Sequence, residues 1–143
     1  MQTRIASELA AAQPRIVLIH AGTNDIVQDF SLSTAPDRLA TLVQTCLDYP
    51  GVQRVLVADL INFRSTATTF NTRAATFRAA LPTALAAQLA DSRCKLASGG
   101  TSFASLIPDA NFTVGDDVHP DLTGYDSKGT RWYDFLNAWG PYP

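Results

Sequence analysis

The sequence has little charge, and neither sign is concentrated in one segment. Charged residues make up 17% of the 143 residues, the formal net charge is −2, and only two of the basic residues are lysines. No run of Lys and Arg is present that would bind the phosphates of a nucleic acid or an anionic membrane surface. We therefore expect neither nucleic acid nor a membrane as a partner.

Long apolar stretches are also missing. No apolar run exceeds the four residues of Ile16–Ile19, whereas a membrane-spanning helix needs roughly 20. Arg4 and Glu8 interrupt the start of the chain, and no apolar segment follows them, so no signal peptide is predicted. Hydrophobic residues nevertheless make up 46% of the sequence. This content excludes general disorder and predicts one domain over residues 1–143.

Cysteine is scarce, with Cys46 and Cys94 alone. Two cysteines are too few for a disulfide scaffold, and these two are too far apart in the sequence for a metal-binding knuckle. Cys46 ends a predicted helix and Cys94 begins a predicted strand, so both should lie at the same end of a sheet. A disulfide between them and two separate buried thiols both remain open interpretations.

Short buried strands and amphipathic helices alternate along the chain. Runs rich in β-branched residues, without polar alternation, predict parallel-sheet strands at residues 15–20, 54–60 and 94–98. Apolar residues at helical spacing predict helices at residues 2–12, from a Thr34 cap to Pro50, at 70–90 with Pro82 inside, and at 122–138. This order predicts an α/β fold in which a parallel sheet of about three strands lies between two layers of helices.

The first chemically interesting loop, residues 21–33, follows the first predicted strand, at the sheet edge where ligands bind in such folds. It begins with Gly22-Thr23-Asn24-Asp25. Gly22 allows a tight turn, Asn24 can donate its amide to a developing oxyanion, and Asp25 can hold the loop by accepting from backbone N–H groups. Taken alone, an ordinary Asx turn explains these residues equally well.

The second such loop contains Asp116-Asp117-Val118-His119-Pro120. His119 is a candidate general base, and Asp116 can accept the Nδ1–H of its imidazole and fix the tautomer. Pro120 restricts the backbone of His119. A surface turn with two solvated aspartates is the alternative interpretation of this segment on its own.

Together the two segments resemble the SGNH (GDSL-like) hydrolase superfamily. The similarity extends to ELAAAQPRIVLIHAGTND and to T-A-P-D-R-L-A after it, and it is nearest to the carbohydrate acetylesterases. The resemblance implies a flavodoxin-like three-layer fold, hydrolysis of a small-molecule or carbohydrate ester without a cofactor, and secretion. It implies His119 as base, Asp116 as the residue that orients it, Asn24 as oxyanion donor, and Gly22 and Asp25 as supports of the loop. The two turns should then converge on one pocket.

The G-D-S block that supplies the nucleophilic serine in this superfamily does not occur in the sequence, and neither does the block with the oxyanion glycine. Other hydroxyls stand in predicted loops or at strand ends, but none in a strand–turn–helix elbow: Ser31, Ser33, Ser65, Thr66, Ser98 and Ser102. The resemblance therefore predicts a partial domain with an incomplete catalytic apparatus, and leaves open whether it is an enzyme. The alternative is a non-catalytic remnant that folds as an oligomer.

Strand 15–20 should lie at an unpaired sheet edge, because the resemblance places two further strands beside it that this sequence lacks. The strand is apolar on both faces and contains neither Lys nor Pro, the residues that commonly protect an edge. We therefore expect a homo-oligomer formed through residues 15–20.

His20 ends the first predicted strand. The favoured interpretation is a buried neutral histidine with both ring nitrogens hydrogen-bonded. The alternative is a metal site formed by His20, His119 and either Asp116 or Asp117, since two histidines and a carboxylate form a known ligand set. No metal is expected.

Overall fold

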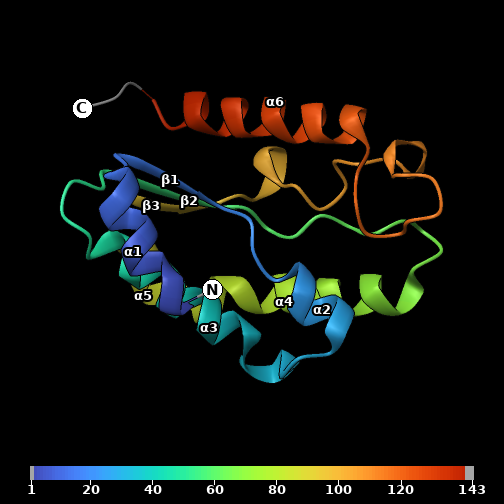
Figure 1. Ribbon diagram of the computed structural model, residues 1–143, viewed down its shortest axis with the longest axis horizontal. Coiled ribbons are helices and arrows are strands. Elements are labelled where there is room, and N and C mark those ends of the chain that lie inside the picture. Colours follow the sequence, from blue (N-terminus) through green and yellow to red (C-terminus); the bar gives the residue numbers. More distant parts are fainter. Residues whose placement is uncertain (1, 141–143) are drawn as a thin grey trace.

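The computed structural model describes residues 2–140 and places three parallel strands between two layers of helices (Figure 1). The strands β1 (Ile16–Ile19), β2 (Arg54–Val57) and β3 (Cys94–Leu96) form one sheet in the order β1-β2-β3. One face of the sheet is covered by α3 (Ala35–Leu47), α4 (Thr68–Ala84) and α5 (Ala86–Leu89), and the other face by α6 (Leu122–Ala138). In the layer of α3, α1 (Gln2–Ala12) packs on α3 beside β1, and α2 (Thr23–Gln28) lies beyond the carboxyl end of β1. The predicted three-layer α/β/α fold is confirmed.

The sheet has one central strand and two edges. β1 pairs with β2 in the register Ile16 to Arg54, and β2 pairs with β3 in the register Val55 to Cys94. All four residues of β2 are buried, whereas Leu18 in β1 is 43% exposed. The predicted edge position of the first strand is therefore confirmed.

Two hydrophobic clusters fill the space between the sheet and the helices. The larger lies between the sheet and α3 and α4, and the smaller lies under α6, where the Phe103 and Trp132 rings have centroids 4.7 Å apart. Cys46 and Cys94 both lie in the larger cluster, and both are free thiols. Burial raises the pKa of Cys94 to about 11, which keeps this thiol protonated.

None of the helices among the described residues is long. The longest, α4 and α6, have 17 residues each, and α4 buries Ala74, Phe77 and Leu81 on one face. Within residues 2–140, none of the helices has both the length and the apolar character that crossing a bilayer requires.

Three local features differ from the sequence-based expectation. The loop 21–33 contains α2, and the long predicted helix is divided at Leu85, three residues after Pro82. Thr34 precedes α3 as predicted, but its hydroxyl does not cap the helix. That hydroxyl instead donates to the Ser31 carbonyl and accepts from Arg38 at 2.6 Å. Three short 3-10 turns also form, at Leu32–Thr34, Gly99–Thr101 and Asp109–Asn111.

Candidate active site

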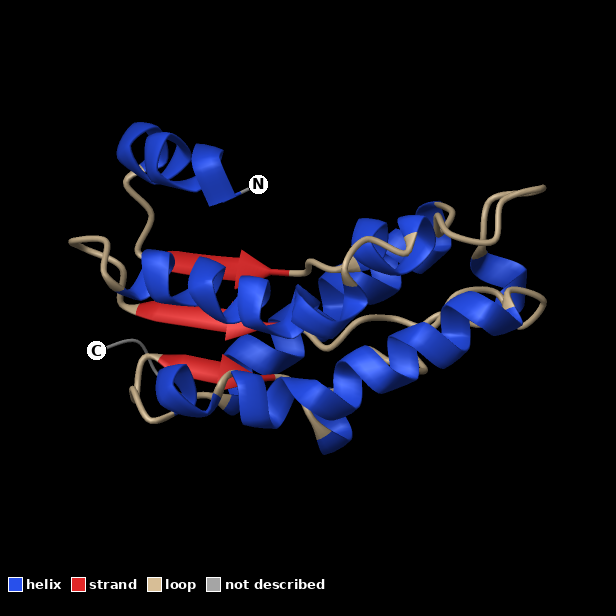
Figure 2. Ribbon diagram, turned by 90° about the horizontal axis from the view of Figure 1, so that it is seen from below, coloured by secondary structure: helices blue, strands red, loops and turns tan. Residues whose placement is uncertain are grey.

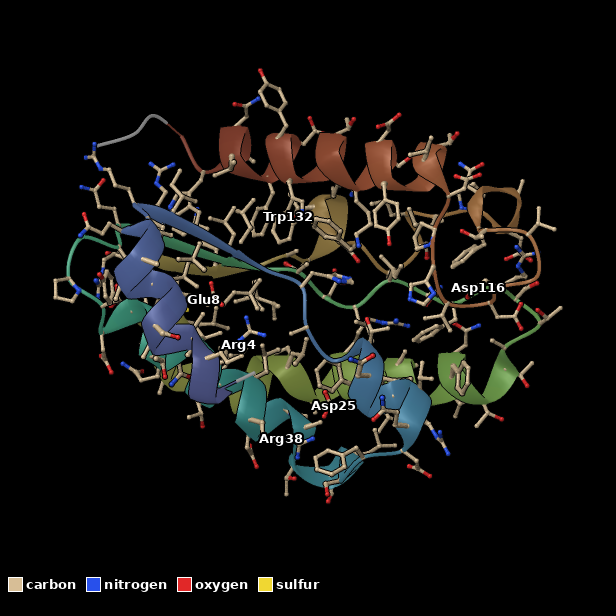
Figure 3. All side chains as sticks on the ribbon, in the orientation of Figure 1. Arg4, Glu8, Asp25, Arg38, Asp116 and Trp132 are labelled. Atoms are coloured by element: carbon tan, nitrogen blue, oxygen red, sulfur yellow. The ribbon has the colours of Figure 1, made fainter. Side chains whose placement is uncertain are left out.

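Both candidate segments lie on the side of the sheet where the three strands end. The strand arrows point the same way in Figure 2, and the loops beyond them carry both segments. In Figure 3, Asp25 lies toward α3 in the lower layer, and Asp116 lies in the loop that leads to α6. The sheet therefore presents both turns at its carboxyl edge.

The Gly22–Asp25 turn is the start of a helix rather than an isolated Asx turn. Gly22 has a φ of 118°, and its carbonyl accepts from the Ile26 N–H at 3.0 Å, which begins α2. A Cβ atom at Gly22 would lie 2.9 Å from the ring of Phe77, so the positive φ favours glycine here and the ring would have to shift to admit a larger residue. The Asn24 side chain is exposed in the first turn of α2.

Asp25 supports this turn through a partner that the sequence did not indicate. Its carboxylate accepts from the Arg38 guanidinium at 2.5 Å (Figure 3), and Arg38 also donates to the Phe30 carbonyl at 3.0 Å. We expected the Asp25 carboxylate to accept from backbone N–H groups, but it instead forms an ion pair that joins α2 to α3. No local spacing rule relates Asp25 to a residue 13 positions later.

Asp116 and His119 form the predicted hydrogen-bonded pair. The Asp116 Oδ2 atom lies 2.7 Å from His119 Nδ1, and Oδ1 accepts from the backbone N–H groups of Val118 at 2.7 Å and His119 at 3.1 Å. The hydrogen bond with the His119 side chain, followed by those from the backbone, lowers the pKa of Asp116 to about 2. The carboxylate is thus ionised at neutral pH and can only accept.

The tautomer of His119 follows from this geometry. Because an ionised carboxylate has no proton to donate, Nδ1 of a neutral His119 must carry the ring proton. The Nε2 lone pair is then available to accept a proton, and the His119 side chain is 66% exposed. The pair has the arrangement that a general base requires.

A small hairpin holds the pair in place. The Thr113 N–H donates to the His119 carbonyl at 2.9 Å, and Phe112 and Pro120 form an antiparallel bridge. The Asp116 N–H donates back to the Thr113 carbonyl at 2.9 Å. These bonds close the turn, so the spacing of Asp116 and His119 is set by the backbone.

Arg64, which sequence reasoning missed, fixes the hairpin to the loop that follows β2. Its guanidinium donates to the carbonyls of Phe112 and Thr113, each at 3.1 Å, and its backbone N–H donates to the Asp117 carbonyl at 3.0 Å. The Asp117 carboxylate accepts from the Thr66 hydroxyl at 3.0 Å. Asp117 is therefore part of the support of the turn, rather than a second solvated aspartate.

The hairpin leads directly into α6. Asp121 caps this helix by accepting from the Gly124 N–H at 2.9 Å. A Cβ atom at Gly124 would lie 2.6 Å from Pro120 Cβ and 2.7 Å from the Asn111 carbonyl oxygen. Gly124 thus permits the close contact between α6 and the hairpin that bears His119.

A cavity of about 430 Å³ opens beside the first turn. Its wall combines the turn and Phe30 with side chains of α3 and α4, most of them apolar. The lining residues are Ala21, Gly22, Asn24, Asp25, Phe30, Ala35, Arg38, Leu39, Leu42 and Phe77. Asp116 and His119 do not line it. The structure thus places Gly22, Asn24 and Asp25 at one cavity, and it pairs Asp116 with His119. The convergence of both turns on one pocket stays a prediction.

His20 lies half-buried at the end of β1, and its ring is not fully hydrogen-bonded, contrary to the prediction. Its Nε2 atom is buried and has no partner within residues 2–140. Burial, and then the positive charge of Lys128, lower the pKa of His20 to about 4, so the ring is neutral at neutral pH. The described residues contain no group of three His, Cys, Asp or Glu side chains that could hold a metal ion, so the alternative site with His119 and Asp116 or Asp117 does not form.

The described residues form a three-layer α/β/α fold with an Asp–His pair in the loop after the last strand. The model of the GDSL-like Lipase/Acylhydrolase family matches residues 1–126, and the chain belongs to this family of ester hydrolases. The predicted superfamily is therefore confirmed.

Solved structures agree with this fold. A proposed acylhydrolase from Bacteroides fragilis is 17% identical, with a TM-score of 0.66 over 96% of this chain and 68% of that chain. A proposed platelet activating factor from Streptococcus pneumoniae is 16% identical, with a TM-score of 0.66 over 95% of this chain and 68% of that chain. A search of curated proteins gave no match.

Proposed function

We propose that this domain supplies the base and an oxyanion donor of an acyl esterase that removes short acyl groups, such as acetyl, from carbohydrate. The observation that carries the proposal is the 2.7 Å contact between Asp116 Oδ2 and His119 Nδ1, which leaves Nε2 as the base. Membership of the GDSL-like Lipase/Acylhydrolase family supports the ester as the bond that is hydrolysed.

In this mechanism His119 Nε2 takes the proton from an attacking hydroxyl as the new C–O bond forms. Asp116 stabilises the imidazolium, and the Asn24 amide donates to the oxyanion. The ester C–O bond then breaks, and the proton passes from His119 to the departing alcohol. The sequence contains no G-D-S serine, so we propose that a segment outside these 143 residues supplies the hydroxyl and that water replaces it, at a much lower rate, in this chain alone.

The open position of the pair supports a small acyl group on a large polar alcohol. The side chains of His119 and Asp116 are 66% and 35% exposed, and the neighbouring Val114 at the tip of the hairpin is 97% exposed. A bulky sugar can approach such a surface turn, whereas a long acyl chain would need an apolar channel leading to the base.

The test compares p-nitrophenyl acetate hydrolysis by the wild-type chain, His119→Ala and Asp134→Asn, which removes an exposed α6 carboxylate as a control. We expect slow turnover in the wild type and the control, and background hydrolysis in His119→Ala. Equal background in all three would contradict the proposal and favour the non-catalytic alternative.

A second measurement tests the substrate class. The rates of hydrolysis of an acetylated xylooligosaccharide and of p-nitrophenyl octanoate are each divided by the rate with p-nitrophenyl acetate. We expect the ratio for the xylooligosaccharide to be the larger of the two. Faster hydrolysis of the octanoate would contradict the carbohydrate acetyl assignment while leaving the esterase assignment intact.

A further inference from the structure

The loop that follows β2 is fastened to the start of α4 by the side chain of one asparagine. Asn71 lies in the first turn of α4, and its Oδ1 atom accepts from the Phe63 N–H at 2.8 Å. Its Nδ2 atom donates to the carbonyls of Phe63 at 3.2 Å and Arg64 at 3.0 Å. The Phe63 side chain is buried, and its ring packs against that of Phe70 with centroids 5.5 Å apart. The backbone of residues 63 and 64 is therefore fixed to α4.

The Arg64 side chain reaches from this fixed backbone to the hairpin that carries His119. Its Nη2 atom donates to the carbonyls of both Phe112 and Thr113, and its guanidinium lies 5.8 Å from the centroid of the Phe112 ring. The Nε atom lies 3.5 Å from the Asp117 carboxylate. A guanidinium holds its donors in a planar fork and keeps its charge at any physiological pH. Arg64 therefore holds one side of the hairpin against the loop after β2.

The backbone of Thr113 joins Arg64 to both members of the Asp116–His119 pair. The Thr113 carbonyl accepts from Arg64 and from the Asp116 N–H, and the Thr113 N–H donates to the His119 carbonyl. A shift of Thr113 would therefore displace both Asp116 and His119. The 2.7 Å contact between their side chains depends on where these two stretches of backbone lie.

The same helix also holds the first turn. The Arg73 guanidinium donates to the Ile26 carbonyl at 3.1 Å and to the Asp29 carboxylate at 2.7 Å. α2 thus lies beside α4 (Figure 1). Asn71 and Arg73 are two positions apart, so the contacts that lead to the two turns start from neighbouring parts of α4.

We propose that α4 positions the His119 base through two residues, Asn71 and Arg64, which are positioning residues of the reaction. This inference rests on the proposed function, in which His119 Nε2 takes the proton from the attacking hydroxyl. Both residues act on the base through the backbone of Thr113 rather than on the substrate. A misplacement of about 1 Å at a reacting group can lower a rate on the order of 10²-fold, so a small movement of the hairpin away from α4 is sufficient to impair catalysis.

The kinetic test measures kcat and KM with p-nitrophenyl acetate for Arg64→Gln, Asn71→Ala and the double variant. We expect Arg64→Gln to lower kcat on the order of 10²-fold and to leave KM unchanged, because the base is displaced while substrate binding is not affected. The double variant should lose no more than Arg64→Gln alone, because both residues act through the same contact. Arg64→Lys keeps the charge and can donate to both carbonyls, so it should recover most of the lost kcat.

Arg131→Gln is the matched control. Arg131 also donates to two backbone carbonyls, those of Gly100 at 2.6 Å and Ser102 at 2.9 Å, but it joins α6 to the loop after β3. This variant should keep the wild-type kcat, and urea unfolding shows that each variant is folded in the assay. An equal loss of kcat in Arg64→Gln and Arg131→Gln, or a rise in KM without a loss of kcat in Arg64→Gln, would overturn the proposal.

The tautomer of His119 provides a readout that does not depend on turnover. The chain contains two histidines, so comparison with His20→Gln assigns the imidazole nitrogens of His119 by ¹⁵N NMR. In alkaline buffer, where an imidazole is neutral, the wild-type spectrum should show the ring proton on Nδ1. Arg64→Gln and Asn71→Ala should show a mixture of the two tautomers, whereas Arg73→Gln, which changes α4 on the side of the first turn, should keep the wild-type spectrum.

Failure of this proposal can be distinguished from failure of the proposed function. A wild-type chain without esterase activity, whose His119 becomes a mixture of tautomers in Arg64→Gln, would contradict the proposed function and support the positioning of His119 by Arg64. A His119 that stays protonated on Nδ1 in both Arg64→Gln and Asn71→Ala would overturn the positioning proposal, even if the wild-type chain hydrolyses the ester.

Discussion

Each of the two turns at the carboxyl edge of the sheet contains an aspartate with a hydrogen-bonded partner, and the partner decides its role. Asp25 accepts from Arg38 at 2.5 Å, and Asp116 from His119 at 2.7 Å. A guanidinium keeps its proton at any physiological pH, so the first pair can only hold helices together. An imidazole nitrogen can accept a proton and return it during a reaction, so the second pair can take part in acid–base chemistry.

The two turns also differ in what fixes their shape. The first is a helix start that packs on α4 through the Gly22–Phe77 contact. The second is a hairpin held by Arg64, a side chain from the loop after β2. Both turns thus depend on contacts between residues far apart in the sequence, but the first is fixed by helix packing and the second by side-chain hydrogen bonds to backbone carbonyls. The following four predictions test this difference.

The largest effect should come from replacing each of the two aspartates separately by asparagine. Asp116→Asn should lower esterase activity about 10²- to 10⁴-fold, because Asn stabilises the wrong tautomer and does not stabilise the imidazolium. Asp25→Asn should change activity little, because Asp25 is paired with Arg38. The measurement is kcat with p-nitrophenyl acetate. Equal losses in both variants would show that the two aspartates do not have separate roles.

The next largest effect should come from replacing the glycine beside each turn by alanine, which should lower the free energy of unfolding by different amounts at the two turns. Gly124→Ala should cost about 3 kcal/mol, because its Cβ would overlap Pro120 and the Asn111 carbonyl, which are backbone-fixed. Gly22→Ala should cost about 2 kcal/mol, through its positive φ and a Phe77 ring that can shift. Urea unfolding measures both. A greater loss for Gly22→Ala would mean that the first turn is the more rigid one.

Acid should destabilise the domain through His20 before it affects Asp116. The pKa of His20 is about 4 in the fold, against an ordinary value of 6.5, so the unfolded chain binds a proton first as the pH falls. The free energy of unfolding should therefore fall by about 2 to 3 kcal/mol between pH 6.5 and 4. Below pH 4 the contribution of His20 should stay constant. Asp116, with a pKa of about 2, contributes only at lower pH.

His20→Gln should remove most of this pH dependence, and Asp116→Asn should leave it in place. Unfolding free energies measured in urea at several pH values distinguish these cases. The same slope in wild type and His20→Gln would place the responsible group elsewhere.

The smallest effect should be the coupling between Asp25 and Arg38. Both side chains are partly exposed, at 27% and 31%, so solvent screening limits the pair to about 1 kcal/mol. A double-mutant cycle with Asp25→Asn and Arg38→Gln measures this coupling in thermal unfolding. A coupling energy near zero would show that the backbone of α2, rather than the ion pair, holds the first turn.

The sequence predicted the parts of the molecule that depend on short-range pattern. The alternation of buried strands and helices specified the fold, and the three-residue spacing of Asp116 and His119 specified their pairing. The six residues of α2 are too few to show helical periodicity, so the sequence pattern predicted a loop for this segment.

Arg38 and Arg64 could not be assigned, because their roles depend on the three-dimensional fold. Arg64 lies 48 positions before the Phe112 carbonyl to which it donates. No periodicity in the sequence relates two such positions. The unpaired Nε2 of His20 was missed for a related reason, since whether a buried nitrogen finds a partner depends on every neighbouring element.

The direct junction between the His119 hairpin and α6 has a consequence for inactivation by heat. Pro120 and Asp121 connect them without a spacer, and α6 contributes Trp132, Phe135 and Leu136 to the smaller cluster. Local opening of this one helix would release the hairpin while the α3–α4 side of the sheet stays folded. The Asp116–His119 pair would then lose its fixed position at a lower temperature than the midpoint of global unfolding.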